Sequence, residues 1–344
     1  MSIDKAYLRW MVVAGLAVLL GGLQQAEAQN TKFSGYMFGD YYYVAASHNP
    51  DLEERNGFWF RRIYFTFDQG IAEGWSVRLR TEMAQPGDFT SGSKMTPVVK
   101  DAYVKWTNGR HTILLGISPT PTWDRVEKAW GYRAVEKTAL DLYKFGSSRD
   151  FGLAARGKLD ADGRVQYHVM VANGASNGTE TDKGKKVLAS LAFSPVKAFT
   201  VEGYADYEDR PGRTNRTTLQ GAAWYSRKEG RLGVQYAHQI QQKADGGEDT
   251  FDVFSVFGAV RLQDKLHALA RFDRQFQPNP KASSIAYVPF AEDAEASFIV
   301  VGLDYALTDK VHVMPNVEVV TYSEAAGATS DSDVLARFTF YYKF

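Results

Sequence analysis

Arginine is the residue type whose spacing in this chain most suggests a chemical role. A guanidinium stays charged and offers several hydrogen-bond donors to phosphate or carboxylate groups. An alternation with a period of two turns one set of charged residues toward a shared inner face: Arg62, Arg78, Arg80, Arg156, Arg164, Arg271 and Arg337, with Glu82, Asp101 and Lys105 among them. Because acidic residues share that face, the pattern fits either a general water-filled passage or one that guides anions.

The residues that enzymes and metal sites need are absent or scattered. The chain has no cysteine, which excludes disulfides, a thiol nucleophile and cysteine-based metal sites. Its six histidines, at positions 48, 111, 168, 238, 267 and 312, show no metal-ligand spacing. The Gly-x-Ser-x-Gly spacing occurs at Gly174, Ser176 and Gly178, but this patch follows a strand into a long loop and opens no helix, so it does not form a nucleophile elbow. The sequence therefore predicts no catalytic residue, no metal and no cofactor, and it places His168 and His312 on the polar inner face.

The elements that must position these charges are strands, because apolar and polar residues alternate from residue 31 onward. In the last segment the apolar face consists of Phe338, Phe340, Tyr342 and Phe344. About sixteen such segments can be recognised, at 31–46, 57–69, 73–84, 97–107, 110–117, 149–158, 164–174, 185–194, 199–209, 215–228, 231–243, 250–263, 266–276, 295–306, 310–323 and 332–344.

The connections between these segments alternate between short turns and longer loops. The short ones carry the Gly, Asn, Asp and Pro residues that tight turns need, as at Asn108-Gly109. Few helices are available to cover the apolar rows, which would instead face lipid. The sequence thus predicts an all-β fold, a transmembrane antiparallel up-and-down barrel of about sixteen strands. An even number of strands places both termini of the barrel chain on the same, periplasmic side of the membrane.

One connection, at 118–148, is exceptionally long and is not of low complexity. Apolar residues recur there at helical spacing, at Trp123, Val126, Trp130 and Ala134. Asp124, followed three residues later by Glu127, resembles a helix N-terminus. The charged residues that would narrow the interior are Asp124, Arg125, Glu127, Lys128, Arg133, Glu136 and Lys137. Adjacent opposite charges at two strand starts, Lys100-Asp101 and Arg149-Asp150, either attach this loop to the wall or are solvated at the rim.

The N-terminus predicts export. Lys5 and Arg9 precede an uncharged apolar run, Trp10 to Leu23, which is too short to span a bilayer as a helix. Ala26-Glu27-Ala28 fits a signal-peptidase site, so we expect a cleaved signal peptide at 1–28 and a barrel at 29–344. Lys and Arg total 40, as do Asp and Glu, and this zero net charge argues against nucleic-acid binding. Aromatic residues make up 14% of the chain, enough for girdles at both membrane interfaces.

The chain resembles the trimeric porins, and more narrowly the phosphate-selective porin O/P family. The segments that carry this resemblance, in order, are Phe33–Asp40, Phe60–Phe67, Lys100–Trp106, Arg149–Gly152 and the terminal Phe344. The resemblance implies a homotrimer in the bacterial outer membrane and a third long loop that folds into the lumen. It also implies lumen arginines that guide anions, and a C-terminal aromatic signal read by the barrel-assembly machinery.

The resulting functional prediction is passive diffusion of small hydrophilic solutes. A more specific version of this prediction adds a preference for anions or phosphate. The partners expected are small hydrophilic or anionic solutes, outer-membrane lipid and the assembly machinery. Two alternatives stay open at this point: an outer-membrane barrel enzyme, and a plugged structural or adhesive barrel. The sequence shows no convincing catalytic set for the enzyme.

Overall fold

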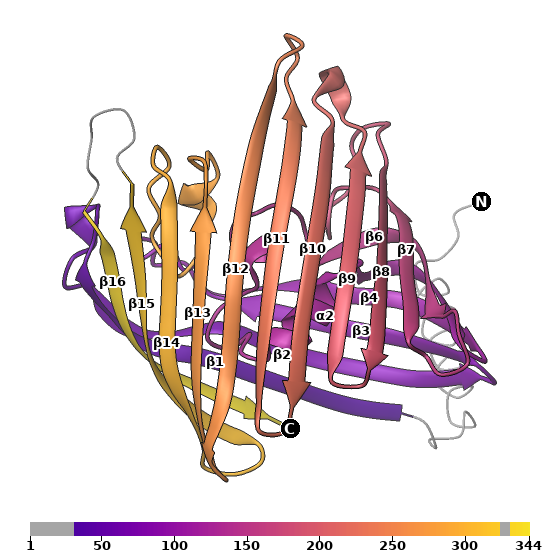
Figure 1. Ribbon diagram of the computed structural model, residues 1–344, viewed down its shortest axis with the longest axis horizontal. Helices are drawn as coiled ribbons and strands as arrows, with labels where there is room; N and C mark the ends of the chain where they lie inside the picture. The colour runs from indigo at the N-terminus through magenta and orange to yellow at the C-terminus, as the bar shows by residue number, and fades with distance from the viewer. Residues whose placement is uncertain (1–30, 324–330) are drawn as a thin grey trace, which may run out of the picture.

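A computed structural model describes residues 31–323 and 331–344 and shows sixteen strands hydrogen-bonded into a closed ring (Figure 1). Each strand pairs antiparallel with its neighbours in the sequence, and β16 pairs with β1 to close the ring. The predicted all-β, up-and-down barrel is therefore confirmed. The predicted signal peptide at 1–28 lies outside the described residues.

The strand bounds follow the predicted segments closely. They are β1 (Thr31–Ala46), β2 (Asn56–Ala72), β3 (Trp75–Ala84), β4 (Thr96–Asn108), β5 (His111–Pro119), β6 (Arg149–Lys158), β7 (Val165–Ala172), β8 (Lys186–Val196), β9 (Phe199–Glu208), β10 (Arg216–Arg227), β11 (Gly230–Gln242), β12 (Glu248–Gln263), β13 (Leu266–Gln275), β14 (Ala296–Ala306), β15 (Val311–Tyr322) and β16 (Asp333–Lys343). Single 3-10 turns occur in three loops, η3 (Pro50–Leu52), η4 (Pro211–Arg213) and η5 (Ala282–Ser284).

Alternation along each strand gives the barrel two unlike faces. On β8, for example, Val187 and Leu191 are more than half exposed on the outside, whereas Leu188 and Ser190 are buried on the inside. Exposed aromatic side chains lie near both ends of the strands, at Phe33, Tyr41, Phe58, Trp75, Phe199, Tyr207, Tyr225, Tyr305 and Tyr342. An apolar band between two aromatic belts is typical of barrels that face lipid.

The last residues of the chain close the ring. The amide of Phe344 donates to the carbonyl oxygen of Gly35 (2.9 Å), and the amide of Gly35 donates back to the carbonyl oxygen of Phe344 (3.1 Å). A Cβ on Gly35 would lie 2.3 Å from the Phe344 ring, so glycine is needed for this close approach. The predicted apolar row of Phe338, Phe340, Tyr342 and Phe344 lies on the outer face of β16.

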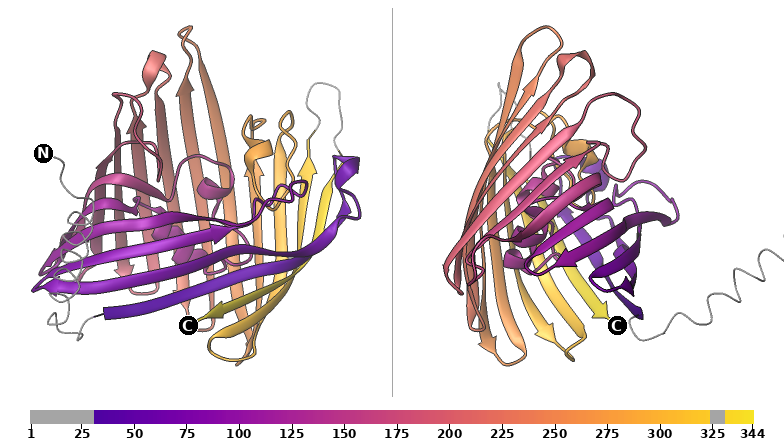
Figure 2. Two further views of the ribbon diagram at one scale, coloured as in Figure 1. Left: turned by 180° about the vertical axis from the view of Figure 1, so that it is seen from behind. Right: turned by 90° about the vertical axis from the view of Figure 1, so that its right-hand side faces the viewer.

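Short turns lie at one end of the barrel, the turn end, and longer connections lie at the other, the loop end (Figures 1 and 2). Two of the longer connections fold into the interior. The inward loop (residues 120–148) carries α2 (Trp123–Trp130) and α3 (Ala139–Leu142). The covering loop (residues 276–295) carries η5. The interior is therefore crossed by chain segments as well as lined by strands.

Helix α2 confirms the helical spacing but differs from the prediction at both ends. It begins after Thr122 rather than at Asp124, and Thr122 makes no side-chain cap. It ends at Gly131 (φ 76°), where a Cβ would overlap the guanidinium of Arg231, so Ala134 falls outside the helix. Within residues 31–323 and 331–344, no helix is long and apolar enough to cross a membrane.

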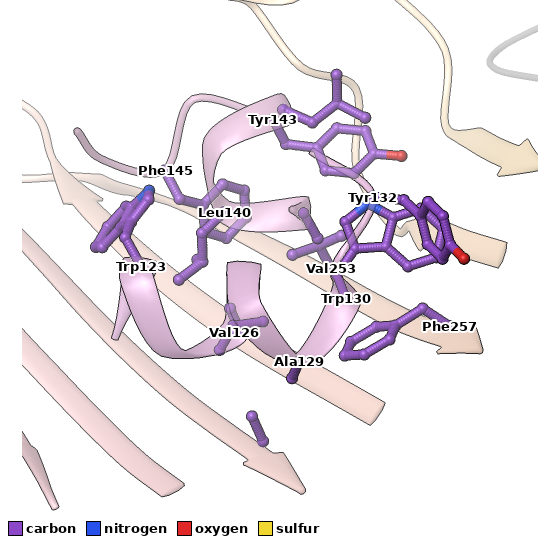
Figure 3. Close-up of a cluster of buried hydrophobic side chains, with 14 of the residues drawn as sticks. Trp123, Val126, Ala129, Trp130, Tyr132, Leu140, Tyr143, Phe145, Val253 and Phe257 are labelled. Atoms are coloured by element: carbon purple, nitrogen blue, oxygen red, sulfur yellow. The ribbon is translucent and has the colours of Figure 1, made fainter. Parts of the chain in front are cut away.

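The inward loop packs against the inner wall through its apolar side chains. Trp123, Val126, Ala129 and Trp130 come from α2 and belong to the same buried apolar cluster as Val253 and Phe257 of β12 (Figure 3). The indoles of Trp123 and Trp130 make edge contacts with Tyr204 and Phe257, with ring centroids 5.8 Å apart in both pairs. Since a fully buried large apolar side chain contributes about 1.5–3 kcal/mol, these contacts hold the loop against β9–β12.

Candidate functional site: the inward loop and the charged lumen

The inward loop is attached to the opposite wall by a buried ion pair. The guanidinium of Arg61 on β2 lies 2.5 Å from the carboxylate of Glu136, and its other amino group donates to the carbonyl oxygen of Val135. Asp40 on β1 lies 3.6 Å from the same guanidinium. Both members of the Arg61–Glu136 pair are almost completely buried. The loop therefore spans the lumen between two walls.

A β-bulge explains why two successive arginines point inward. The β1–β2 register shifts between Phe38 and Gly39. Phe38 pairs with Arg62 and Gly39 pairs with Phe60, so Arg61 is left without a partner residue on β1. This extra residue breaks the two-residue alternation, and Arg61 and Arg62 both lie on the inner side. The sequence analysis assigned only Arg62 to the lumen and missed Arg61, because strict alternation places adjacent residues on opposite faces.

Arg149 provides a second attachment at the start of β6. Its guanidinium lies 2.5 Å from Asp101 on β4 and 3.3 Å from Asp124 on α2. The sequence allowed two interpretations of the adjacent charges at these strand starts, attachment of the loop to the wall or solvation at the rim. Arg149 and Asp101 attach the loop to the wall. Lys100 instead pairs with Glu82 at 3.0 Å.

A third attachment reaches the loop from β13. Arg271 donates to the carbonyl oxygen of Lys137 and is held by Asp273, with 2.8 Å between Nε and Oδ1. Arg61 and Arg271 therefore hold consecutive stretches of the inward loop from strands on either side of the β1–β16 closure.

Most of the other predicted lumen arginines are inside the barrel, and their charges are compensated. Arg62 pairs with Glu82 (3.2 Å), Arg78 with Asp68 (2.7 Å), and Arg80 with Asp101 (3.4 Å). Arg337 lies 2.9 Å from both Asp40 and Glu318. Lys105 shares the inner face of β4 with Asp101 and Tyr103. These residues form opposed charge rows rather than a row of free cations.

Arg164, unlike the other arginines predicted for the lumen, does not lie on a strand. It was expected on the inner face of a strand, but β7 begins at Val165, and Arg164 lies in the preceding turn. Its side chain is 56% exposed and pairs with Asp162 at 3.1 Å. The turn is closed by Asp160, whose carboxylate accepts from the amides of Arg164 and Val165.

Three cations that form no salt bridge among the described residues gather in one cavity, here called the cationic chamber, although Glu202 still acts on Arg125 and partly opposes the burial that lowers the pKa of this arginine. The chamber has a volume of about 540 Å³, lies at the turn end between α2 and strands β6–β10, and is lined by Arg125, Lys128 and Arg156. None of these three makes an ion pair within residues 31–323 and 331–344. The one carboxylate among the lining residues, Asp124, is engaged by Arg149.

The remaining lining of the cationic chamber is polar. It includes Ser194, Thr200, Ser226 and the buried His168, whose Nε2 has no hydrogen-bond partner among the described residues. The predicted inner positions of His168 and of His312, which pairs with Asp304 at 2.8 Å, are both observed. Across residues 31–323 and 331–344, no group of three or more His, Asp or Glu side chains could hold a metal ion.

The remaining predicted loop residues have distinct environments. Glu127 pairs with Arg133 at 3.3 Å. Burial alone would raise the pKa of the Glu136 carboxyl, but Arg61 outweighs it and holds that pKa below its usual range. Burial lowers the pKa of Lys137 to about 7, and Asp141 and Glu136 only partly oppose this effect. The loop thus contains a lysine poised to lose its charge near neutrality.

The covering loop was not predicted to fold inward. Tyr287 is buried at its centre, where its hydroxyl accepts from Arg62 (3.1 Å) and its amide donates to the carbonyl oxygen of Gly87 (2.7 Å). The loop also contacts the inward loop, since Asn279 donates to the carbonyl oxygen of Tyr143 (3.2 Å). The apolar run Ile285–Ala291 was an available signal, because a solvent-exposed loop rarely contains so many apolar residues.

Cations also gather near the loop end. Burial lowers the pKa of Lys281 to about 8, and Arg216 and Arg210 lower it further, while Glu208 opposes them. Lys281 donates to the carbonyl oxygen of Lys144 (3.1 Å), which places this group beside the inward loop.

Comparison with solved structures identifies the same kind of barrel in bacterial outer-membrane porins. An anion-selective porin from Comamonas acidovorans matches with a TM-score of 0.67 and 12% identity, over 91% of this chain and 99% of that one. OmpF of Salmonella typhi, in complex with daunomycin, matches with a TM-score of 0.67 and 13% identity, over 92% and 98%. The trimer form of OmpT, an outer membrane protein of Vibrio cholerae, matches with a TM-score of 0.63 and 12% identity, over 91% and 99%.

No family model and no curated protein matches the chain. The identities to the solved porins are low, so the likeness establishes the fold: a closed, porin-like, sixteen-stranded barrel. The narrower resemblance to phosphate-selective porins stays a prediction.

Proposed function

We propose that this protein is a diffusion channel of the bacterial outer membrane that admits small hydrophilic solutes. The observation that carries the proposal is a closed barrel with an apolar outer face, a charged interior and a loop held across that interior by Arg61, Arg149 and Arg271. Such a barrel encloses water, and the loop restricts the size of what passes. No residue need perform chemistry.

We further propose a preference for anions, carried by a different set of cations from the one the sequence suggested. Arg78 and Arg80 are compensated by Asp68 and Asp101, so their fields are largely cancelled. The cations without carboxylate partners among the described residues, Arg125, Lys128 and Arg156, line the chamber beneath the inward loop. A group of unpaired cations in a partly buried cavity attracts anions strongly, because the field is poorly screened there. Phosphate is the specific anion that we propose as a solute.

The first experiment is planar-bilayer recording of the refolded mature chain under a KCl gradient. We expect discrete conductance steps and a reversal potential on the anion-selective side. Absence of conductance from folded, heat-modifiable protein would contradict the channel function and favour a plugged barrel. Addition of phosphate to conducting channels then tests whether phosphate competes with chloride.

A matched pair of variants tests the assignment of the cations. Arg156→Gln, which removes one charge from the cationic chamber, should shift the reversal potential toward cations. Arg164→Gln, which removes a charge from an exposed turn, should leave it unchanged. An equal shift in both variants would show that the net charge of the barrel, rather than the cationic chamber, sets the preference.

The proposal includes a homotrimer, outer-membrane lipid as the surrounding medium, export by the predicted signal peptide and assembly by the barrel-assembly machinery. The support for a trimer is the likeness to OmpT, an outer membrane protein of Vibrio cholerae solved in a trimer form. The apolar band and the aromatic belts support contact with lipid. Conductance in groups of three steps, together with the mass of the detergent-purified particle, tests the trimer.

A further inference from the structure

A second cavity beneath the inward loop differs in chemistry from the cationic chamber. This aromatic chamber has a volume of about 400 Å³ and lies at the turn end between α2 and strands β1 and β14–β16. Its size falls within the range of about 300–1,000 Å³ that is usual for small-molecule sites. Apart from His312 and the charged residues of the inward loop, none of the residues predicted for the inner face lies in its lining.

Four aromatic rings contribute to the walls of this chamber. Tyr36 and Phe38 come from β1, Tyr341 from β16 and Tyr132 from the inward loop. The rings of Tyr36 and Tyr341 have centroids 6.1 Å apart, and the guanidinium of Arg133 lies 5.6 Å from the Phe38 ring centre. Tyr36 and Tyr341 are only partly buried, so part of each ring remains accessible to a solute. Such rings offer flat apolar faces inside an otherwise polar lumen.

The aromatic chamber contains two pairs, each of a carboxylate and a basic side chain. Glu127 lies 3.3 Å from Arg133 in the roof, and Asp304 lies 2.8 Å from His312 in the wall. Lys128 is shared with the cationic chamber. The aromatic chamber therefore presents both hydrogen-bond donors and acceptors with little excess of either charge.

We propose that the aromatic chamber is a binding subsite for a cyclic polyhydroxylated solute, a monosaccharide or a short saccharide. A sugar ring has apolar C–H faces that can pack on Tyr36 and Tyr341. Its hydroxyl groups both donate and accept, so they can bond to the carboxylates and to the guanidinium at the chamber's edges. Two carboxylates in the lining disfavour an aromatic acid, which would match the rings but not the charges. The inference rests on the proposed channel function, of which it names a second class of solute.

The test compares two probes that differ in ring closure, glucose and its reduced open-chain form sorbitol, on the full mature protein in planar bilayers. Added on the turn side, glucose should reduce the KCl current along a saturating curve. Sorbitol at equal concentration should produce only the small, non-saturating decrease expected of a more viscous solution. Equal effects of the two probes would overturn the proposal.

Variants locate the effect within the lumen. Tyr341→Leu should raise the half-blocking concentration of glucose about tenfold, the change expected when one aromatic contact of about 1.4 kcal/mol is lost. Tyr36→Leu provides a second variant if Tyr341→Leu does not fold. Trp224→Leu, which removes an aromatic ring from the cationic chamber, should leave the glucose block unchanged.

The KCl current recorded in the same experiment separates the two proposals. Loss of that current would count against the channel function, whereas a normal current without glucose block would count against the sugar subsite alone. If glucose still blocks both tyrosine variants, glucose does not bind in the aromatic chamber. Block by benzoate but not by glucose would show that the chamber binds an aromatic acid and not a sugar.

Discussion

Arg61 and Glu136 form a buried ion pair between the barrel wall and the inward loop, although 75 positions separate them in the chain. Glu136 is further fixed because its carbonyl oxygen accepts from the indole of Trp130 (2.9 Å) and its carboxylate accepts from the amide of Lys137 (2.7 Å). The pair thus connects the wall, the end of α2 and the middle of the loop. The position of the inward loop depends on this pair.

Arg61→Met should destabilise the docked inward loop by about 3–5 kcal/mol, because it leaves Glu136 buried without its partner. We expect faster hydrogen exchange across residues 132–142 and larger open-channel noise. Arg61→Met combined with Glu136→Met should restore much of the protection, since a well-packed apolar pair can replace a buried ion pair. Unchanged exchange in the single variant would show that the apolar contacts alone hold the loop.

Lys137 should make docking of the inward loop sensitive to pH. Its pKa is lowered by burial to about 7, against 10.5 for an ordinary lysine. Between these values a released lysine binds a proton that the docked one does not, so raising the pH through this window stabilises the docked loop. Hydrogen exchange in the loop, corrected for the intrinsic rate, should slow from pH 7 to pH 10. Lys137→Met should remove most of that dependence, and an unchanged slope in this variant would assign it to another group such as Lys281.

Gly87→Ala should release the covering loop. A Cβ at position 87 would lie 2.5 Å from the Tyr287 ring, in a residue whose φ is 73°. We expect trypsin to cleave after Lys281 at least several-fold faster than in the unmodified protein. Gly212→Ala is the matched control, because its φ is 71° but no atom lies within 4 Å of the added Cβ. Similar cleavage in the two variants would mean that backbone strain, not the clash with Tyr287, has the larger effect.

Phe344→Ala separates stability of the barrel from recognition during assembly. The backbone bonds between Phe344 and Gly35 do not require the aromatic ring, and the ring is 39% exposed on the outer face. We therefore expect the variant to refold in detergent nearly as well as the unmodified chain. Its yield in the outer membrane of cells should fall several-fold. Equal losses in detergent and in cells would assign the ring to stability rather than to recognition.

The strands could be predicted because their alternation is a local property of the sequence. Segments such as 31–46 and 149–158 agree with β1 and β6 to the residue. The inner position of Arg61 could not be predicted, since the bulge opposite Phe38 and Gly39 depends on how two strands pair. Compensation of Arg78 and Arg80 likewise depends on Asp68 and Asp101 from neighbouring strands.

The candidate site was only partly accessible from the sequence for a similar reason. Helical spacing identified α2, but which of its charges remain unpaired depends on where Arg149 and Arg133 lie after folding. The covering loop was missed because strand alternation carries no information about how a connection folds. The contact of Tyr287 with Gly87 joins two loops that are distant in the sequence.

The eight-residue helix α2 forms a boundary of both chambers, and Lys128 lies in the lining of each. Substitutions on this one short helix can therefore alter charge preference and ring preference while the hydrogen-bonded wall stays the same. Under the proposed channel function, a few substitutions in α2 would therefore be enough to change the preferred solute, because α2 forms no part of the strand pairing that closes the barrel. For a protein engineer, α2 is correspondingly the smallest segment to exchange in order to change what the channel admits.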